Sequence, residues 1–107
     1  MNVVTNDNIQ AAIALNNLHE VIDPEIGLNV VDLGLIYQLD FNPEKSEIAC
    51  IMTLTTQFCP MGEAITTGVK ENIEQTFPDY SVDVTLTFDP PWNYGMISEQ
   101  GRSFLGR

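Results

Sequence analysis

The chain has 107 residues, which is enough for one domain with a hydrophobic core of its own. Its formal net charge is −11, with 15 Asp and Glu against four Lys and Arg, and this balance argues against nucleic acid and anionic membranes as partners. No signal peptide and no apolar segment of membrane-spanning length is present, so we expect a single domain over residues 1–107 in the cytoplasm.

A first helix is predicted near the N-terminus. Its apolar residues recur at the spacing of one helix face, and they are Ala11, Leu15, Leu18 and Ile22. Thr5 or Asn6 can cap this helix, and Pro24 ends it. In the turn that follows, Asp23 and Glu25 place two carboxylates one residue apart, which either form a solvated turn or border a site.

Two strands are predicted next, over residues 35–41 and 47–54, and a polar turn joins them into a hairpin. Before the first strand, Asp32 lies between apolar neighbours and would need a hydrogen-bonding partner if buried. Gly34 indicates a bulge or a close approach of two backbone segments. Cys50 falls on the apolar face of the second strand, so we expect it to be part of the core.

A second helix is predicted over residues 60–77, where apolar residues form a stripe at three- and four-residue spacing. A third strand with regular alternation follows over residues 81–88, and Ser98 can cap a short last helix. The helix between the second and third strands allows those strands to run parallel. We therefore predict a two-layer α+β fold of order α-β-β-α-β plus a short C-terminal helix, with a three-stranded mixed sheet.

The stretch between the second strand and the second helix carries a cysteine of a different kind. Pro60 suits the first position of a helix, which would place Cys59 at or just before the helix cap. There the helix dipole and the free amide groups favour a thiolate, which is both a nucleophile and a metal ligand. The alternative is that Cys59 packs as a small apolar side chain, the usual fate of a free cysteine.

Most enzyme constellations are missing from the sequence. It has one histidine, no glycine-rich nucleotide-binding motif and no C-x-x-C pair. A stable zinc or iron–sulfur site needs about four ligands, whereas one chain offers at most two thiolates. Two copies of Cys59 across a two-fold axis, with carboxylates or an external thiol, could hold iron or a cluster transiently, and this need makes a homodimer plausible.

Three separated motifs follow one another along the chain, and they are Asp23-Pro24-Glu25 with Val30-Val31-Asp32-Leu33-Gly34-Leu35-Ile36-Tyr37, Thr55-Thr56-x-x-Cys59-Pro60, and Phe88-Asp89-Pro90-Pro91-Trp92. Together with Ser98 they resemble the iron–sulfur cluster assembly domain family of SufT and PaaD-like proteins. The resemblance runs from about Leu18 to the C-terminus. No cysteine-rich segment follows the last motif, so the resemblance points to the stand-alone SufT type.

This resemblance implies a role in the maturation of iron–sulfur proteins rather than in the turnover of a metabolite. It implies a reactive cysteine at Cys59, with iron or a cluster bound transiently and no cofactor bound stably. The residues expected to line the site, from the family motifs and their neighbours, are Asp23, Glu25, Thr55, Thr56, Pro60, Glu63, Pro90, Pro91 and Trp92.

Two functions are compatible with these residues. The first is a non-enzymatic maturation factor that serves the iron–sulfur assembly machinery and client apo-proteins, with Cys59 in a pocket bordered by Glu25, Thr56 and Trp92. The second is an adaptor that recruits those partners through its acidic surface and the Pro-Pro-Trp segment, without thiol chemistry. A thiol enzyme would need a base near Cys59, and the carboxylates of Glu25 and Glu63 are poor bases for a thiol.

Overall fold

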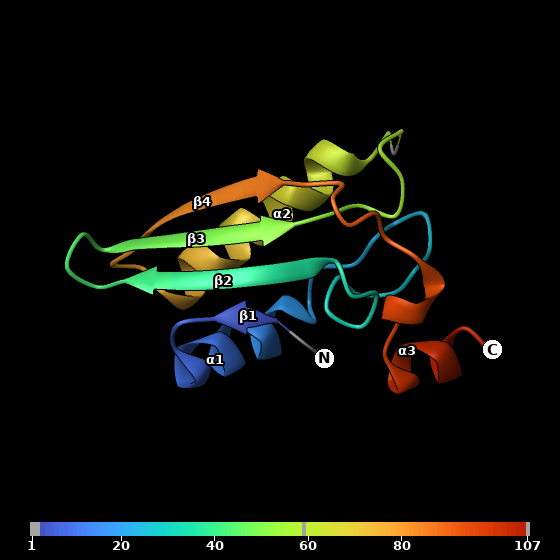
Figure 1. Ribbon diagram of the computed structural model, residues 1–107, viewed down its shortest axis with the longest axis horizontal. Coiled ribbons are helices and arrows are strands. Elements are labelled where there is room, and N and C mark those ends of the chain that lie inside the picture. The colour runs from blue at the N-terminus through green and yellow to red at the C-terminus, as the bar shows by residue number, and fades with distance from the viewer. Residues whose placement is uncertain (1–2, 59, 107) are drawn as a thin grey trace.

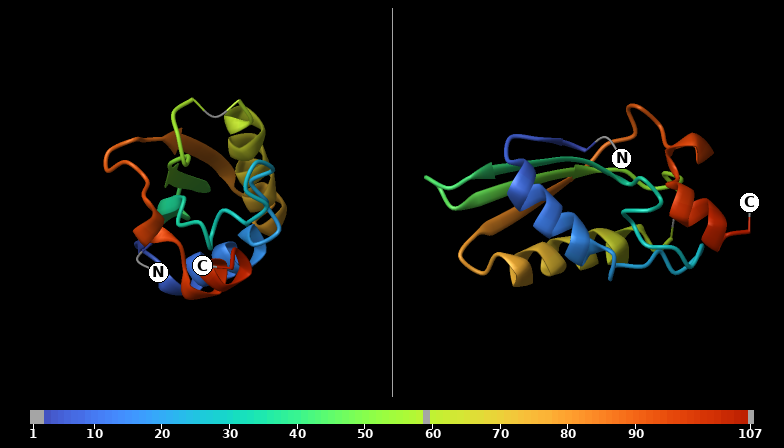
Figure 2. Two further views of the ribbon diagram at one scale, coloured as in Figure 1. Left: turned by 90° about the vertical axis from the view of Figure 1, so that its right-hand side faces the viewer. Right: turned by 90° about the horizontal axis from the view of Figure 1, so that it is seen from below.

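The computed structural model of the protein describes residues 3–58 and 60–106. Four strands, three α-helices and one 3-10 turn are formed within these ranges (Figure 1), in the order β1 (Val4–Thr5), α1 (Asn8–Leu18), β2 (Ile36–Asn42), β3 (Glu47–Met52), α2 (Gly62–Thr76), β4 (Ser81–Leu86), η1 (Tyr94–Met96) and α3 (Glu99–Phe104). The sheet has the order β1-β2-β3-β4. Figure 2 shows that α1 and α2 cover one face of this sheet and leave the other face open.

The sheet is mixed, as predicted. Strands β2 and β3 form an antiparallel hairpin, whereas β3 and β4, which α2 connects, pair in parallel. The predicted number of three strands is wrong, since β1 adds a fourth that pairs in parallel with β2. Two residues are too few to show an alternating pattern in the sequence. The side chain of Asn6 fixes this edge, because it both donates to and accepts from the backbone of Phe41 at 2.9 Å.

The first helix differs from its prediction at both ends. Asp7 is its cap, with a side chain that accepts a hydrogen bond from the backbone N–H of Gln10 at 3.1 Å, because Thr5 is already part of β1. At its other end, α1 stops at Leu18, so Ile22 lies outside the helix and is exposed. The buried face of α1 includes Ala14, which the predicted set lacks, and does not include Ile22.

The hydrophobic core lies between the sheet and the two longer helices. The stripe predicted on the second helix supplies its buried residues Ile65, Val69 and Ile73. Opposite them, the inward side chains of β3 are Ile48, Cys50 and Met52. The prediction that Cys50 is a core residue is therefore confirmed.

The second helix begins two residues later than predicted. Pro60 belongs to the preceding turn, and α2 starts at Gly62 without a side-chain cap. A Cβ atom on Gly62 would lie 2.7 Å from Cδ1 of Leu54, so the start of α2 packs closely on the residues that follow β3. The first turn of α2 therefore forms where Gly62 packs against Leu54, and not at Pro60.

The segment before β2 is tied to the C-terminal part of the chain. The Oδ1 atom of Asp32 accepts from the Ser98 hydroxyl at 2.7 Å, and its Oδ2 atom accepts from Asn29 at 2.8 Å. Gly34 has a φ of +79°, and a Cβ atom there would lie 2.9 Å from Cβ of Met96. Ser98 caps α3 as predicted, so Asp32 and Gly34 together hold the chain around η1 and α3 against the start of β2.

Candidate functional site

A pocket of about 410 Å³ lies where the loops that follow β3 and β4 meet the turn after α1. Three of the residues predicted for the site line it, namely Glu25, Thr55 and Trp92. Its other lining residues are mostly apolar, and they are Ile26, Leu33, Tyr94, Ile97 and Leu105. The fold therefore brings together one carboxylate, one hydroxyl and one indole from three distant segments of the chain.

The turn that carries Glu25 is built by its neighbour Asp23. The Asp23 side chain is buried, and its Oδ1 atom accepts a hydrogen bond from the backbone N–H of Glu25 at 2.9 Å. The Asp23 carbonyl also accepts from Gly27, whose φ is +82°. Asp23 thus shapes the turn and is absent from the pocket lining, while Glu25 is part of it.

Trp92 forms a wall of the pocket and is anchored in it. Its indole N–H donates to the carbonyl of Leu33 at 2.6 Å, and its ring centroid lies 5.5 Å from that of Tyr94. Pro90 and Pro91 are exposed and do not line the pocket. The Pro90 carbonyl instead accepts from the hydroxyl of Tyr37 at 2.9 Å, which fixes the path of the segment that leads to Trp92.

The loop between β3 and α2 contributes unequally to the pocket. Thr55 is half-buried and lines it, whereas Thr56 is exposed and accepts from the backbone N–H of Phe58 at 3.2 Å. Pro60 and Glu63 are also exposed and lie outside the lining. Cys59, the predicted functional thiol and transient metal ligand, lies outside the described residues.

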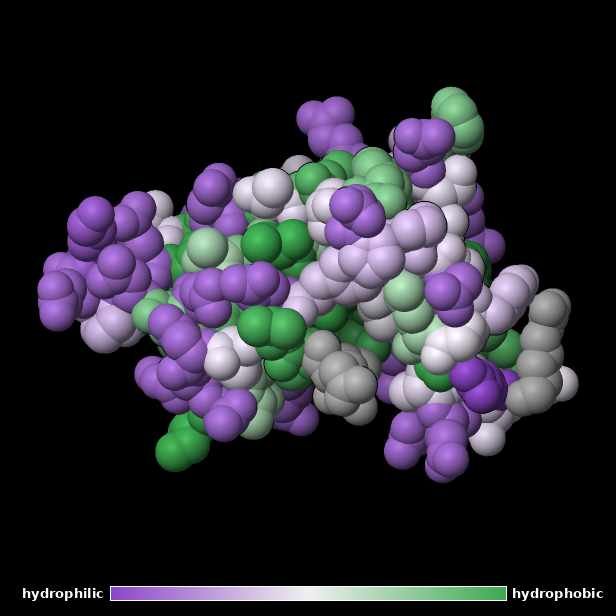
Figure 3. Space-filling model, viewed as in Figure 1, coloured by the Kyte–Doolittle hydropathy of each residue, from purple (hydrophilic) through white to green (hydrophobic). Residues whose placement is uncertain are grey.

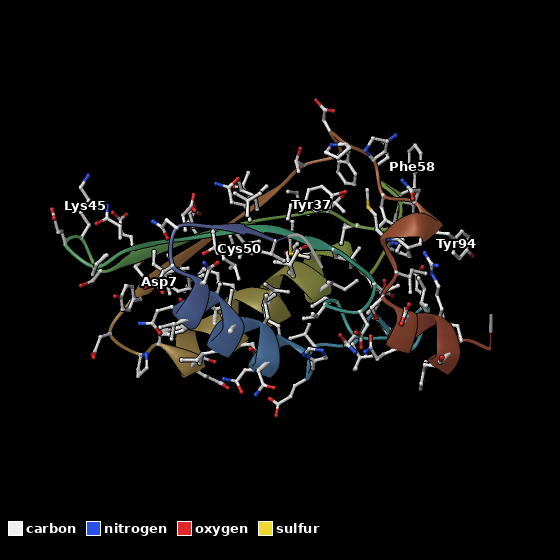
Figure 4. The ribbon with its side chains drawn as sticks, turned by 60° about the horizontal axis from the view of Figure 1, so that its bottom comes forward. Asp7, Tyr37, Lys45, Cys50, Phe58 and Tyr94 are labelled. Atoms are coloured by element: carbon white, nitrogen blue, oxygen red, sulfur yellow. The ribbon has the colours of Figure 1, made fainter. Side chains whose placement is uncertain are left out.

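Aromatic residues are exposed at this end of the molecule. Figure 4 shows Phe58 and Tyr94 at the same end, on different segments of the chain. The exposed fractions of these two side chains are 81% and 62%. Sequence reasoning missed Tyr94, although its position two residues after Trp92 was a usable signal.

The apolar wall extends beyond the pocket. A smaller hollow of about 220 Å³ shares Tyr94, Ile97 and Leu105 with the pocket, and Arg102 also lines it. Apart from Trp92, the apolar residues of this wall lie in η1, directly after η1 and α3, and in the turns before β2, and Leu33 is the one that stands in a motif. Ile26, Ile97 and Leu105 are identified only by their contacts in the folded chain.

The second cysteine cannot replace the predicted thiol. Cys50 is fully buried, and burial raises the pKa of its thiol to about 12. Among residues 3–58 and 60–106, no three His, Cys, Asp or Glu side chains are grouped so that they could hold a metal ion. No helix in these ranges is both long and apolar enough to cross a membrane.

These features define a class of small α+β domains in which a turn after the first helix, a β–α loop and a C-terminal aromatic segment enclose a largely apolar pocket. Residues 10–86 match the sequence model of a family described as iron-sulfur cluster assembly protein, and the chain belongs to this family.

Relatives with descriptive names support this assignment. The chain is 40% identical to an Fe-S protein maturation auxiliary factor of Porphyromonas gingivalis, over 83% of this chain and 84% of that protein. It is 36% identical to the Fe-S protein maturation auxiliary factor SufT of Staphylococcus aureus, over 80% of this chain and 97% of that protein.

Solved structures of similar sequence share the fold. A domain of unknown function from Bacillus anthracis is 31% identical and superposes with a TM-score of 0.85, over 92% of this chain and 93% of that one. A conserved hypothetical protein from Thermotoga maritima is 36% identical with a TM-score of 0.75, over the whole of this chain and 99% of that one.

Proposed function

We propose that this protein is an auxiliary factor in the maturation of iron–sulfur proteins, and that Cys59 is the thiol with which it acts. The relatives named as Fe-S protein maturation auxiliary factors support the role. The main observation in support of the site is the pocket, which is lined by Glu25, Thr55 and Trp92. Thr55 belongs to the segment between β3 and α2, and the sequence of this segment contains Cys59. Thr56 and Glu63 flank Cys59 in the sequence and are both exposed. In this proposal they lie at the entrance of the site and not in the pocket lining.

The chemistry of the pocket suits a cargo that is held briefly. A thiolate binds iron and iron–sulfur clusters, and a carboxylate such as that of Glu25 is a harder ligand that also binds iron. The apolar walls around Trp92 limit the access of water and strengthen electrostatic interactions inside the pocket. Iron or a cluster is the cargo in this proposal, and Cys59 either holds it transiently or contacts a thiol of the client.

The proposed role is non-enzymatic and belongs in the cytoplasm. Its partners are the iron–sulfur assembly machinery and client apo-proteins, which exchange iron, a cluster or a thiol contact with this chain. The homodimer expected from the sequence stays a prediction, and the maturation role does not require it.

The test is the maturation of a cluster-dependent enzyme in cells that produce either Cys59→Ser or Cys50→Ala in place of the wild-type protein. We expect Cys59→Ser to lose most of the maturation activity and Cys50→Ala to retain it, with both variants folded by circular dichroism. Full maturation in cells that contain Cys59→Ser would overturn the proposal.

The exposed aromatic residues favour an adaptor as the second candidate function. Phe58 and Tyr94 expose most of their side chains at the same end of the molecule, as an anchor for a partner would (Figure 4). Trp92 is a poor test of this idea, because removal of an indole that is hydrogen-bonded to Leu33 would disturb the fold as well. An adaptor should lose partner capture in a Phe58→Ser/Tyr94→Ser variant and keep it in Cys59→Ser, whereas the reverse pattern would reject it.

A further inference from the structure

The first helix is apolar on two opposite faces. Ala11, Ala14 and Leu18 point into the core. On the other side, Ile9 and Ile13 expose 76% and 45% of their side chains. A surface helix that serves only its own core carries polar residues on its outer face, so the second apolar face needs another explanation.

The exposed residues of the outer face follow the spacing of a helix–helix contact. They are Ile9, Ala12, Ile13 and Asn16, at positions i, i+3, i+4 and i+7, and we call them the α1 strip. Residues at this spacing lie side by side along one face of a helix and form a narrow seam. Among the described residues, Figure 1 shows no other element below α1, and Figure 3 shows a strongly hydrophobic group projecting at this lower edge of the molecule.

The charge distribution indicates which partner fits the α1 strip. The helix Asn8–Leu18 contains no charged residue, although the chain as a whole has a net charge of −11. Two copies of such an acidic chain repel each other wherever their carboxylates face. Two copies can therefore approach closely only through an uncharged surface. A partner that binds through opposite charges has no charged side chain to pair with on this helix.

We propose that the α1 strip is the contact surface between two copies of this chain, with the two α1 helices packed against each other about a two-fold axis. This proposal goes beyond the maturation role and does not depend on it. In Figure 4, Asp7 at the start of α1 and Tyr94 at the pocket lie toward opposite ends of the molecule. The dimer would therefore leave both pockets open to partners, rather than join them.

The interface is expected to be weak. An 11-residue helix is about 16 Å long, and a seam of four side chains is smaller than the roughly 800 Å² per partner of a standard stable interface. Salt should strengthen this contact, because the distance over which the like charges act falls from about 30 Å at 0.01 M salt to about 3 Å at 1 M. A contact held by opposite charges would respond to salt in the other direction.

The test is analytical ultracentrifugation of the whole chain from micromolar to near-millimolar concentration, in low and in high salt. We expect the wild-type protein to shift toward the dimer mass with concentration, and more so in high salt. The variant Ile9→Glu/Ile13→Glu should be at least tenfold weaker in self-association. Glu suits these helical positions, so circular dichroism should stay unchanged.

A matched control separates the surface from the added charge. The variant Ile22→Glu/Phe104→Glu adds the same two carboxylates at exposed apolar residues outside α1, and it should dimerise nearly as well as the wild-type protein. A wild-type protein that stays monomeric in high salt would overturn the proposal, as would equal loss of the dimer in both variants. Neither result bears on the maturation assay with Cys59→Ser, so the two proposals can fail separately.

Discussion

At the scale of single residues, the carboxylate of Asp32 is the centre of a small network. It accepts hydrogen bonds from Asn29 and Ser98, and its Oδ1 atom lies 3.9 Å from Nε2 of His19. Partial burial acts to raise the pKa of Asp32, but the hydrogen bonds from Asn29 and Ser98, together with His19, lower it below its usual value of 3.8. We expect Asp32→Asn to reduce the free energy of unfolding by about 2 kcal/mol near pH 7.

The lowered pKa gives this prediction a pH dependence. A carboxyl whose pKa is lower in the folded state stabilises the fold above its unfolded pKa, and this contribution is lost as the pH falls through the folded pKa. The difference in unfolding free energy between wild-type protein and Asp32→Asn should thus be constant well above 3.8 and shrink below it. Urea unfolding of both proteins over a pH series measures this difference, and one that persists unchanged in strong acid contradicts the assignment.

The two cysteines should differ in reactivity. The thiol of Cys50 is buried, which raises its pKa to about 12, so almost none of it is thiolate at neutral pH. We expect alkylating reagents to leave Cys50 unmodified in the folded protein and to modify it after denaturation. Mass spectrometry of the peptides reads each cysteine separately, and a Cys50 that reacts as fast as Cys59 in the folded protein would be incompatible with this core position.

At the scale of elements, two glycines allow a controlled comparison. Gly27 and Gly34 have nearly the same positive φ, +82° and +79°. A Cβ atom on Gly27 would meet nothing within 4 Å, whereas one on Gly34 would collide with the backbone and Cβ of Met96. Both alanine variants therefore carry the strain of a left-handed backbone, and only Gly34→Ala adds a collision.

We expect Gly27→Ala to lower the free energy of unfolding by about 1 kcal/mol and Gly34→Ala by about 3 kcal/mol or more. The collision would push η1 away from the start of β2, and with it the segment that carries Trp92. Fluorescence of this single tryptophan should accordingly change in Gly34→Ala and stay unchanged in Gly27→Ala. Equal effects of both substitutions would mean that the contact with Met96 does not hold this segment.

Elements with long, regular patterns were predictable, and short ones were not. The stripe of α2 and the alternation of β3 lead to the observed core, because each buries one face along its whole length. The two residues of β1 have no pattern, and their pairing depends on the side chain of Asn6 and a backbone 35 residues away. Likewise, motifs pointed to Glu25 and Trp92, whereas the apolar wall of the pocket exists only where separate turns meet.

At the scale of the whole molecule, a group of acidic side chains lies at the end formed by the β2–β3 turn. The hollow beside the β2–β3 turn is about 560 Å³ and is lined in part by Asp40, Glu44, Glu47 and Asp83. Figure 3 shows the hydrophilic side chains gathered there, at the left. Within residues 3–58 and 60–106 the structure has one Lys–carboxylate pair, Lys70 with Glu74 at 2.9 Å, and an exposed pair of this kind adds little. Repulsion among carboxylates is therefore the larger electrostatic effect on stability.

This imbalance predicts that salt stabilises the fold. Screening weakens the repulsion among many carboxylates more than it weakens the attraction between Lys70 and Glu74, so unfolding midpoints in urea should rise with ionic strength. The variant Glu47→Gln/Asp83→Asn removes two exposed carboxylates from neighbouring strands, and we expect it to be more stable than wild-type protein by roughly 0.5 kcal/mol at low salt. Its advantage should disappear at high salt, where the removed charges are already screened. A midpoint that falls with ionic strength, or an advantage that salt leaves intact, would show that packing at the hairpin, rather than charge, limits the stability of this end.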